Sequence, residues 1–437
     1  MKLIKCILTT TAMTTIFLTA NASAQNVGKL ESEITELRQQ LSKITKKLET
    51  VVKKVEENKT SPIKVKWEPA PEISSPDGRF KMNLRGRLFM DSAWINDANN
   101  NENTKATEFR TARLGIEGIA WTDVKYKFEI DFAGDIATVK DAYLQWSGPV
   151  KVKIGQFKTP NSLEEQTSSR YITFMERASF TDAFGLARQM GVGVGYSGDD
   201  YTVNVGIFRG ANATKSEDEG YALAGRVTYG PKFGNTQLHF GTSFRYQKPG
   251  ADQSLIRYRQ RPHAHLAANR YVATDRISES DTFLGLEMAA VMNSLSVQAE
   301  WATVKANLAN PATGQNDPTF SGGYIEASYI LTGEKRSYKA KKGSFQRIKV
   351  NNPVFSGGMG AWQLAVRYDR IDLSDEGIFG GEQDTFIVGV NWWLNRHTRF
   401  MVNYSNSQIK NARDVSLNDI NGENSVNALG IRAQVDW

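Results

Sequence analysis

From Phe80 to the C-terminal Trp437, apolar and polar residues alternate with a period of two. The segment VKYKFEIDF, which begins at Val124, shows the pattern most clearly, because every second residue is apolar and each residue between is Lys, Glu or Asp. Successive side chains of a β-strand point to opposite faces, so such a strand has one apolar face and one charged face. The pattern therefore predicts an all-β fold for this part of the chain.

Two architectures use strands of this kind. A soluble sandwich turns its apolar faces inward, whereas a transmembrane barrel turns them toward lipid. Sixteen alternating segments can be counted, and an even number is typical of bacterial barrels. They begin near residues 80, 108, 124, 138, 150, 190, 201, 220, 236, 282, 295, 321, 360, 383, 397 and 425.

The lengths of the connections favour the barrel. After every second strand the connection is mostly a short turn, whereas most of the others are long and span residues 92–107, 158–189, 209–219, 247–281, 306–320, 371–382 and 408–424. One connection, 333–359, is long where a short turn is expected. Outer-membrane barrels combine short periplasmic turns with longer external loops. The sequence thus predicts a 16-stranded antiparallel transmembrane β-barrel over residues 80–437.

The first 24 residues read as a secretory signal peptide. Lys2 and Lys5 precede a mostly apolar stretch, and small residues at 22–24 suit cleavage. The alternative, a short membrane anchor, is disfavoured because the apolar run is too short and too rich in Thr to span a bilayer. Cleavage would lower the net charge from +7 to +5 and remove Cys6, the sole cysteine, so neither a disulfide nor a cysteine metal site is expected.

Residues 25–60 are predicted to form a periplasmic coiled-coil helix, followed by a Pro-rich linker at 61–79. Two apolar series repeat every seven residues: Val27, Ile34, Leu41, Leu48 and Val55, and Leu30, Leu37, Ile44 and Val51. Together they make a seam with alternating spacings of three and four. A single amphipathic helix on a globular surface is the alternative, but four sustained heptads favour self-association.

The connection at 247–281 holds a row of cations. Arg257, Arg259 and Arg261 occupy alternate positions, so in an extended chain their guanidinium groups point the same way, about 6.6 Å apart. Buried like charges need a partner, and a mobile anion can supply one. Arg matches phosphate oxygens and stays charged at all relevant pH. The alternative is an external basic loop that contacts anionic lipopolysaccharide.

Several motifs resemble those of the phosphate-selective porins of the O and P type. They are GQFKTPNSLEEQTSSRYITFMER at 155–177, DFAGDIATVKDAYLQW at 131–146, LTGEKRSY at 331–338 and GAWQLAVRYDRIDL at 360–373. The resemblance implies a homotrimer of sixteen-stranded barrels, in which 158–189, 247–281 and 333–359 fold into the lumen. It also implies that Lys158 and Arg170 are the central cations, that Asp131 is the central acid, and that Arg257, Arg259 and Arg261 belong to an arginine ladder.

These observations predict an outer-membrane porin for passive diffusion of anions, most specifically phosphate or polyphosphate. A weakly selective porin whose coiled coil tethers the envelope, with contacts to the cell wall, is the alternative. Lipid and lipopolysaccharide are expected to surround the barrel, and no cofactor, metal or nucleic acid is expected. An enzyme is disfavoured because the four His residues show no recognisable catalytic spacing.

Overall fold

The computed structural model describes residues 24–59, 63–67, 70–210, 218–414 and 416–437. Residues 1–23 of the predicted signal peptide lie outside the described residues. The chain divides into two compact units, Met1–Lys64 and Val65–Trp437. No helix in the described ranges is long and apolar enough to cross a bilayer.

The first unit contains one long helix, α2 (Ala24–Lys59), which confirms that this segment is helical. Its described seam residues are all exposed: Ile34, Leu37, Leu41, Ile44, Leu48 and Val51. The self-association predicted from these heptads stays a prediction. An isolated helix gains no stability from an apolar stripe that faces water, so this stripe would be stabilised by a partner surface.

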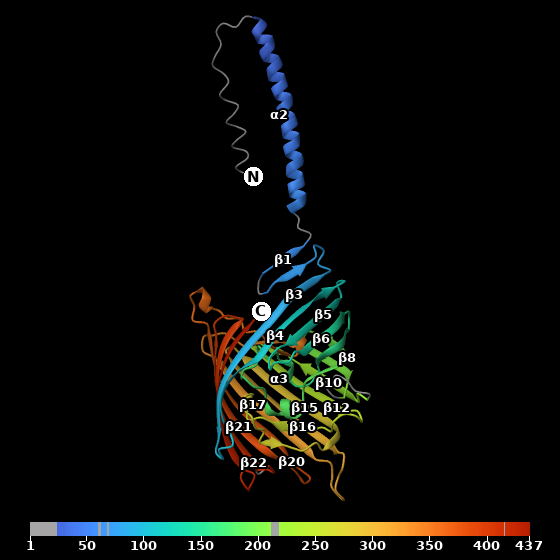
Figure 1. Ribbon diagram of the computed structural model, residues 1–437, viewed down its shortest axis with the longest axis vertical. Helices are drawn as coiled ribbons and strands as arrows, with labels where there is room; N and C mark the ends of the chain where they lie inside the picture. The colour runs from blue at the N-terminus through green and yellow to red at the C-terminus, as the bar shows by residue number, and fades with distance from the viewer. Residues whose placement is uncertain (1–23, 60–62, 68–69, 211–217, 415) are drawn as a thin grey trace. The chain divides into compact units, whose positions relative to one another are not determined.

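The second unit is a closed antiparallel barrel, which confirms the predicted fold (Figure 1). Its wall is formed by β3 (Lys81–Asp97), β4 (Asn103–Ala120), β5 (Val124–Asp131), β6 (Thr138–Ser147), β7 (Lys151–Lys158), β8 (Arg188–Ser197), β9 (Tyr201–Phe208), β10 (Tyr221–Tyr229), β12 (Thr236–Lys248), β15 (Ser278–Met292), β16 (Leu295–Leu308), β17 (Thr319–Ile330), β20 (Ala361–Asp375), β21 (Ile378–Trp393), β22 (Thr398–Ala412) and β23 (Asn424–Asp436). Each strand pairs with the next, and β23 pairs back onto β3, from Val426 opposite Asp97 to Asp436 opposite Arg87. Closure leaves no open edge to pair with other chains.

The shorter elements lie in the connections. They are β1 (Lys64–Lys66), β2 (Glu72–Ser74), α3 (Leu163–Gln166), α4 (Ser179–Ala183), β11 (Lys232–Phe233), β13 (Arg259–Gln260), β14 (Val272–Ala273), β18 (Ser337–Lys339), η1 (Ala340–Lys342), β19 (Ser344–Gln346) and η2 (Val354–Ser356). The predicted linker at 61–79 thus contains two short strands, of which β2 pairs with the first residues of β3.

Two connections expected to be long are hairpins. The chain turns at 98–102 and at 376–377, whereas the sequence predicts loops over 92–107 and 371–382. The flanking residues, rich in Asn, Asp and Glu, continue the strands because their backbone groups pair across the hairpin, as Asn96 does opposite Asn103. The polar residues therefore show where the apolar outer surface of the barrel ends, whereas the strands themselves continue beyond that point.

The two faces of the wall differ as the alternation predicts. On β15, Leu284, Leu286 and Met288 are 55%, 62% and 58% exposed, while the intervening Glu287 is 2% exposed. Arg245 and Arg367 are among the largest fully buried side chains. A water-soluble protein has the opposite arrangement, so the exterior is suited to lipid and the charged groups lie in the lumen.

Candidate anion pathway in the barrel lumen

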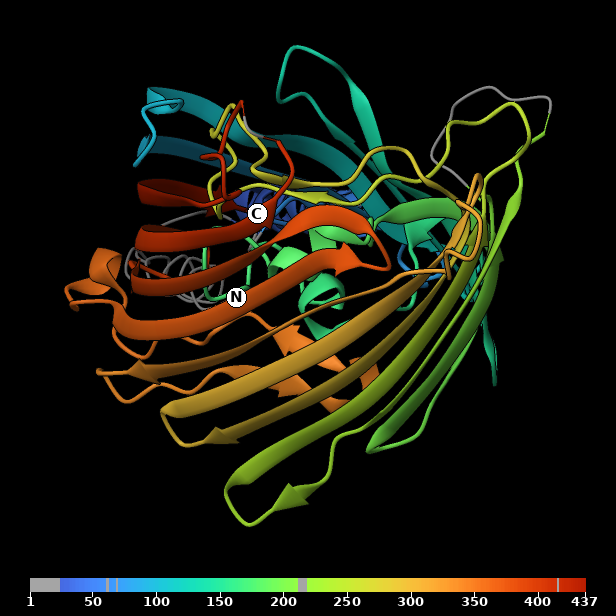
Figure 2. The same cartoon turned by 90° about the horizontal axis from the view of Figure 1, so that it is seen from below.

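The connection 159–187, between β7 and β8, crosses the lumen. Figure 2 shows it, with its short helices, inside the ring of strands. The backbone N–H groups of Leu163 and Glu164 donate to the Glu300 carboxylate on β16 at 2.8 and 2.7 Å. The Ser179 N–H donates to Asp369 on β20 at 3.1 Å. These bonds fix the connection to the far wall, as a segment that narrows a pore requires.

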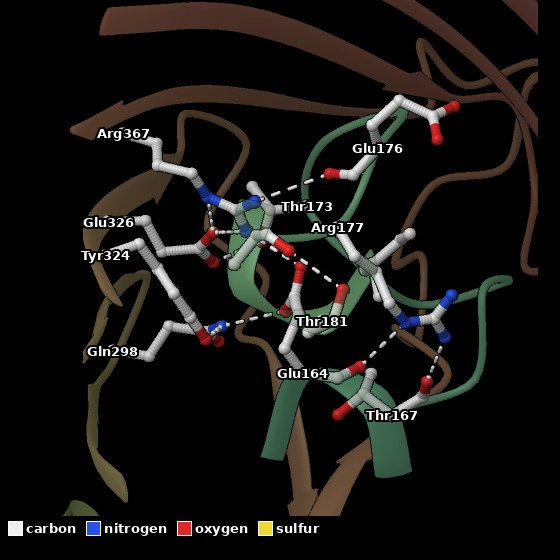
Figure 3. Close-up of polar contacts among 12 residues, drawn as sticks. Glu164, Thr167, Thr173, Glu176, Arg177, Thr181, Gln298, Tyr324, Glu326 and Arg367 are labelled. Atoms are coloured by element: carbon white, nitrogen blue, oxygen red, sulfur yellow. Dashed lines mark hydrogen bonds and ion pairs between the residues drawn. The ribbon is translucent and has the colours of Figure 1, made fainter. Parts of the chain in front are cut away.

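A buried arginine is a further anchor of this connection. Arg367 on β20 is fully buried, and its Nη2 lies 2.8 Å from Glu164 Oε1 while its Nε donates to Glu326 Oε2 at 3.0 Å (Figure 3). Its guanidinium also lies 4.9 Å from the Phe174 ring and 4.5 Å from the Tyr324 ring. Two carboxylates and two rings therefore surround one guanidinium, which suits its donor fork and flat faces.

The connection between β12 and β15 also turns inward and packs on 159–187. Tyr258 Oη donates to Asp281 at 3.1 Å, Arg270 pairs with Asp182 at 2.9 Å, and His263 Nε2 lies 2.9 Å from Ser179 Oγ. An apolar cluster that includes Phe180, Phe184, Tyr258 and Phe283 fills the space between the two segments and the wall. The two inward segments thus form one packed body.

The long connection between β17 and β20 turns inward as well. Arg336 Nη1 donates to Gln298 on β16 at 2.7 Å, and Arg347 Nη1 donates to Asp436 on β23 at 3.0 Å. Lys341 pairs with Asp199 in the β8–β9 turn at 2.7 Å. This segment therefore spans the lumen at the end with the short turns, which explains why one turn of that end is long.

A cavity of 550 Å³ remains between these segments and the wall. Its lining includes eleven Arg and Lys but only four Asp and Glu, an excess of seven positive charges. The cations are Arg87, Arg110, Arg113, Lys127, Lys153, Lys158, Arg170, Arg177, Arg188, Arg261 and Arg432, and the acids are Asp141, Glu165, Glu176 and Asp182. Walls of low dielectric constant strengthen the attraction of such a lining for anions.

Five of the six predicted site residues divide between two cavities. Lys158, Arg170 and Arg261 line the 550 Å³ cavity, and Arg257 and Arg259 line a second one of 230 Å³. The linings of the two cavities share Asp182 and Gly185, so the cavities adjoin. The arginine row therefore extends from the lining of the smaller cavity to that of the larger one.

Asp131 is placed differently from the role expected for it. It is not part of either lining, and its Oδ2 accepts a hydrogen bond from Arg113 Nε at 2.8 Å. The backbone N–H of Ala112 donates to its other oxygen at 3.0 Å. Asp131 therefore holds a cation of the larger cavity in place and does not face the cavity itself.

Three of the four acids lie between two cations each. Asp141 contacts Lys127 and Arg188, both at 2.7 Å. Glu176 contacts Arg110 and Arg432, both at 3.2 Å. Glu165 contacts Lys158 and Arg177, both at 3.1 Å.

Some lining cations have no such acid. Among the described residues, no carboxylate lies within 4.0 Å of Lys153, Arg257, Arg259 or Arg261. Lys153 lies over the rings of Tyr143 and Phe157 at 4.6 and 4.9 Å. These cations are the ones left to attract a mobile anion.

The arginine row is electrostatically strained. Burial lowers the pKa of Arg259, and the neighbouring Arg270 and Arg257 lower it further. Burial also lowers the pKa of Arg261, to which Arg270 contributes again. Both guanidinium groups stay charged at neutral pH, so a passing anion would relieve their mutual repulsion.

Sequence reasoning did not assign Arg110, Arg188 or Arg432 to the anion site. Arg432 alternates with the outward-facing Ile431 on β23, so its parity was a usable signal for a lumenal position. The alternation tells on which face of a strand a side chain lies, but not how far along the barrel axis it lies. The position along the axis decides which side chains share a cavity. That information comes from the register between strands.

A closed barrel with an apolar exterior and a cationic lumen defines an outer-membrane porin. The chain belongs to the family described as phosphate-selective porin O and P, which it matches over residues 80–437. It is 34% identical over 396 residues to an uncharacterized protein of Caulobacter vibrioides, covering 86% of this chain and 78% of that protein. It is 25% identical over 389 residues to Porin O of Pseudomonas aeruginosa, covering 78% of this chain and 86% of that porin.

Solved structures share the fold. An anion-selective porin from Comamonas acidovorans superposes with a TM-score of 0.52 at 14% identity, over 81% of this chain and 99% of that one. The family and the fold point to a channel rather than an enzyme.

Proposed function

We propose that this porin conducts small anions by passive diffusion and that phosphate is its preferred substrate. The observation that carries the proposal is that eleven Arg and Lys but four Asp and Glu line the 550 Å³ cavity. Conduction needs sites that attract an ion yet release it, and a row of cations provides several weak sites in sequence. The guanidinium groups of Arg257, Arg259 and Arg261, which have no carboxylate partner within the described part of the chain, supply that row.

The position of the arginine row supports this role over contact with lipopolysaccharide. Arg261 lines the larger cavity, and Arg257 and Arg259 line the adjoining one, so all three are available to an ion inside the barrel. Planar guanidinium groups bind tetrahedral oxyanions through paired hydrogen bonds, which favours phosphate over chloride. Lys158 and Arg170 would act at the larger cavity, with Asp131 acting through Arg113.

We further propose that the protein is a homotrimer in the outer membrane, with helix α2 in the periplasm. The short turns would face the periplasm, as they do in outer-membrane barrels. The exposed seam of α2 supports self-association, which would fix the assembly of three barrels. Tethering to the cell wall is the second candidate for this helix. Deleting residues 25–60 distinguishes the two, because tethering predicts a weakened envelope with an intact oligomer.

Reversal potentials in planar bilayers test the anion pathway. We expect the wild type to prefer anions, and Lys153→Glu to lower the anion-to-cation permeability ratio several-fold, because the substitution reverses a charge in the cavity lining. Lys305→Glu is the matched control, since Lys305 is exposed on the outer face of β16. Titrating phosphate into chloride should reduce the chloride conductance with saturation. A cation-selective wild type, or equal effects of the two substitutions, would refute the pathway.

A further inference from the structure

Glu165 is held rigidly in the lining of the larger cavity. It belongs to α3, and its backbone N–H donates to Ser162 Oγ at 3.2 Å. The two residues before it are bound to the Glu300 carboxylate, and the side chain of Glu164 turns to the wall to pair with Arg367. The Glu165 side chain is 8% exposed and points instead toward Lys158 and Arg177. Its place is therefore set by the fold.

The carboxylate bridges the two cations with both of its oxygens. Oε1 lies 3.1 Å from Lys158 Nζ, and Oε2 lies 3.1 Å from Arg177 Nε. The remaining contacts of these cations are backbone carbonyls, such as that of Thr167, which accepts from Arg177 Nη2 at 2.8 Å. Burial alone would raise the pKa of Glu165, but Arg177 and Lys158 outweigh it and lower the pKa. The group is thus a permanent anion near neutral pH.

Glu165 differs in one respect from the other bridging acids of the cavity. Without Asp141, Lys127 would keep Glu129 at 3.7 Å. Without Glu176, Arg432 would keep Asp91 at 2.6 Å. Within the described residues, Lys158 and Arg177 have Glu165 as their one carboxylate partner, so neither keeps a carboxylate when Glu165 is removed.

We propose that Glu165 is a built-in counter-ion that occupies the position of an oxyanion between Lys158 and Arg177 and so sets the affinity of the pore for phosphate. This inference rests on the proposed anion conduction and names a residue that tunes it. A phosphate that approaches this pair must share the two cations with a fixed carboxylate and is repelled by it. Phosphate binding is weakened as a result, and the ion is released faster. This favours a high rate of conduction over tight binding.

The test is phosphate block of chloride current through the full-length oligomer in planar bilayers. Glu165→Gln keeps the shape of the side chain and one acceptor oxygen but removes the charge. Removing the competing carboxylate should lower the half-blocking phosphate concentration about tenfold, which corresponds to about 1.4 kcal/mol. Glu165→Ala removes the whole carboxylate and should also tighten the phosphate block. The test therefore needs only one of the two variants to fold.

Glu117→Gln is the matched control. Glu117 also pairs with a cation, Arg85, at 2.5 Å, but it does not line the cavity. The Glu117→Gln substitution should leave the half-blocking phosphate concentration unchanged, although it removes the same charge from the barrel. The double variant Lys158→Gln/Glu165→Gln should return the block toward the wild-type value.

The outcomes separate the two proposals. An anion-selective wild type whose phosphate block is unchanged or weakened in folded Glu165 variants overturns the role of Glu165 alone. A similar tightening in Glu117→Gln also overturns it, because the effect would then follow from overall charge. A wild type without anion preference overturns the conduction proposal itself.

Discussion

Replacing Arg367 by Met should loosen the segment that narrows the pore. The substitution keeps most of the apolar part of the side chain but removes the guanidinium. That group donates to Glu164 at 2.8 Å and to Glu326 at 3.0 Å, so both carboxylates lose a cationic partner. Removing one partner of a buried ion pair lowers the free energy of unfolding by about 3–5 kcal/mol. Glu326 keeps Arg336 at 3.2 Å and Glu164 keeps Gln298 at 3.2 Å, so we expect the lower end, about 3 kcal/mol.

Two measurements follow from this value. Urea unfolding in detergent should show the loss in the free energy of unfolding, and single-channel recordings should show larger and noisier conductance as 159–187 detaches from the wall. Arg370→Gln on the same strand is the control, because Arg370 is 34% exposed and its ion pairs are worth about 1 kcal/mol or less. Equal stability losses in the two variants, or a quiet channel of wild-type conductance in Arg367→Met, would refute the anchoring role.

Two further predictions concern acid and the N-terminal helix. Burial alone would raise the pKa of Glu176, but Arg110 and Arg432 hold it at about 2, below its ordinary 4.5. Its ion pairs therefore stabilise the docked segment fully above pH 4.5 and are lost as the pH falls toward 2. Gating noise in single-channel recordings should rise over that interval. Noise that does not depend on pH would contradict a role of Glu176 in holding the segment. Leu41→Asp places a charge in the seam of α2 and should cost at least about 2 kcal/mol per helix in oligomer stability, measured by thermal dissociation of the full-length oligomer. Ser42→Asp, one residue off the seam, should leave the oligomer intact, and equal dissociation temperatures for both variants would argue against a coiled coil.

The predicted anion site shows how far reasoning from residues reaches. Lys158, Arg170 and Arg261 come together at one cavity, as expected for residues on a lumenal strand face or an inward connection. Asp131 does not line that cavity, although its carboxylate accepts a hydrogen bond from Arg113, which does. A motif specifies that such an acid is present, but the rotamers and registers around it decide what it contacts.

The barrel could be predicted from the amino-acid pattern alone. A period of two fixes the two faces of each strand, and the sixteen predicted segments match the sixteen strands of the wall, although β4, β15 and β21 begin at Asn103, Ser278 and Ile378, before the alternation becomes visible near 108, 282 and 383. The composition of the anion pathway, in contrast, depends on how the chain folds in three dimensions. Arg432 pairs with Asp91 across 341 residues, and Arg367 with Glu164 across 203, because barrel closure and inward connections bring distant segments to one height. Local periodicity contains no information on height, so the pairing of charges, and hence which cations stay free for an anion, arises only when the barrel closes.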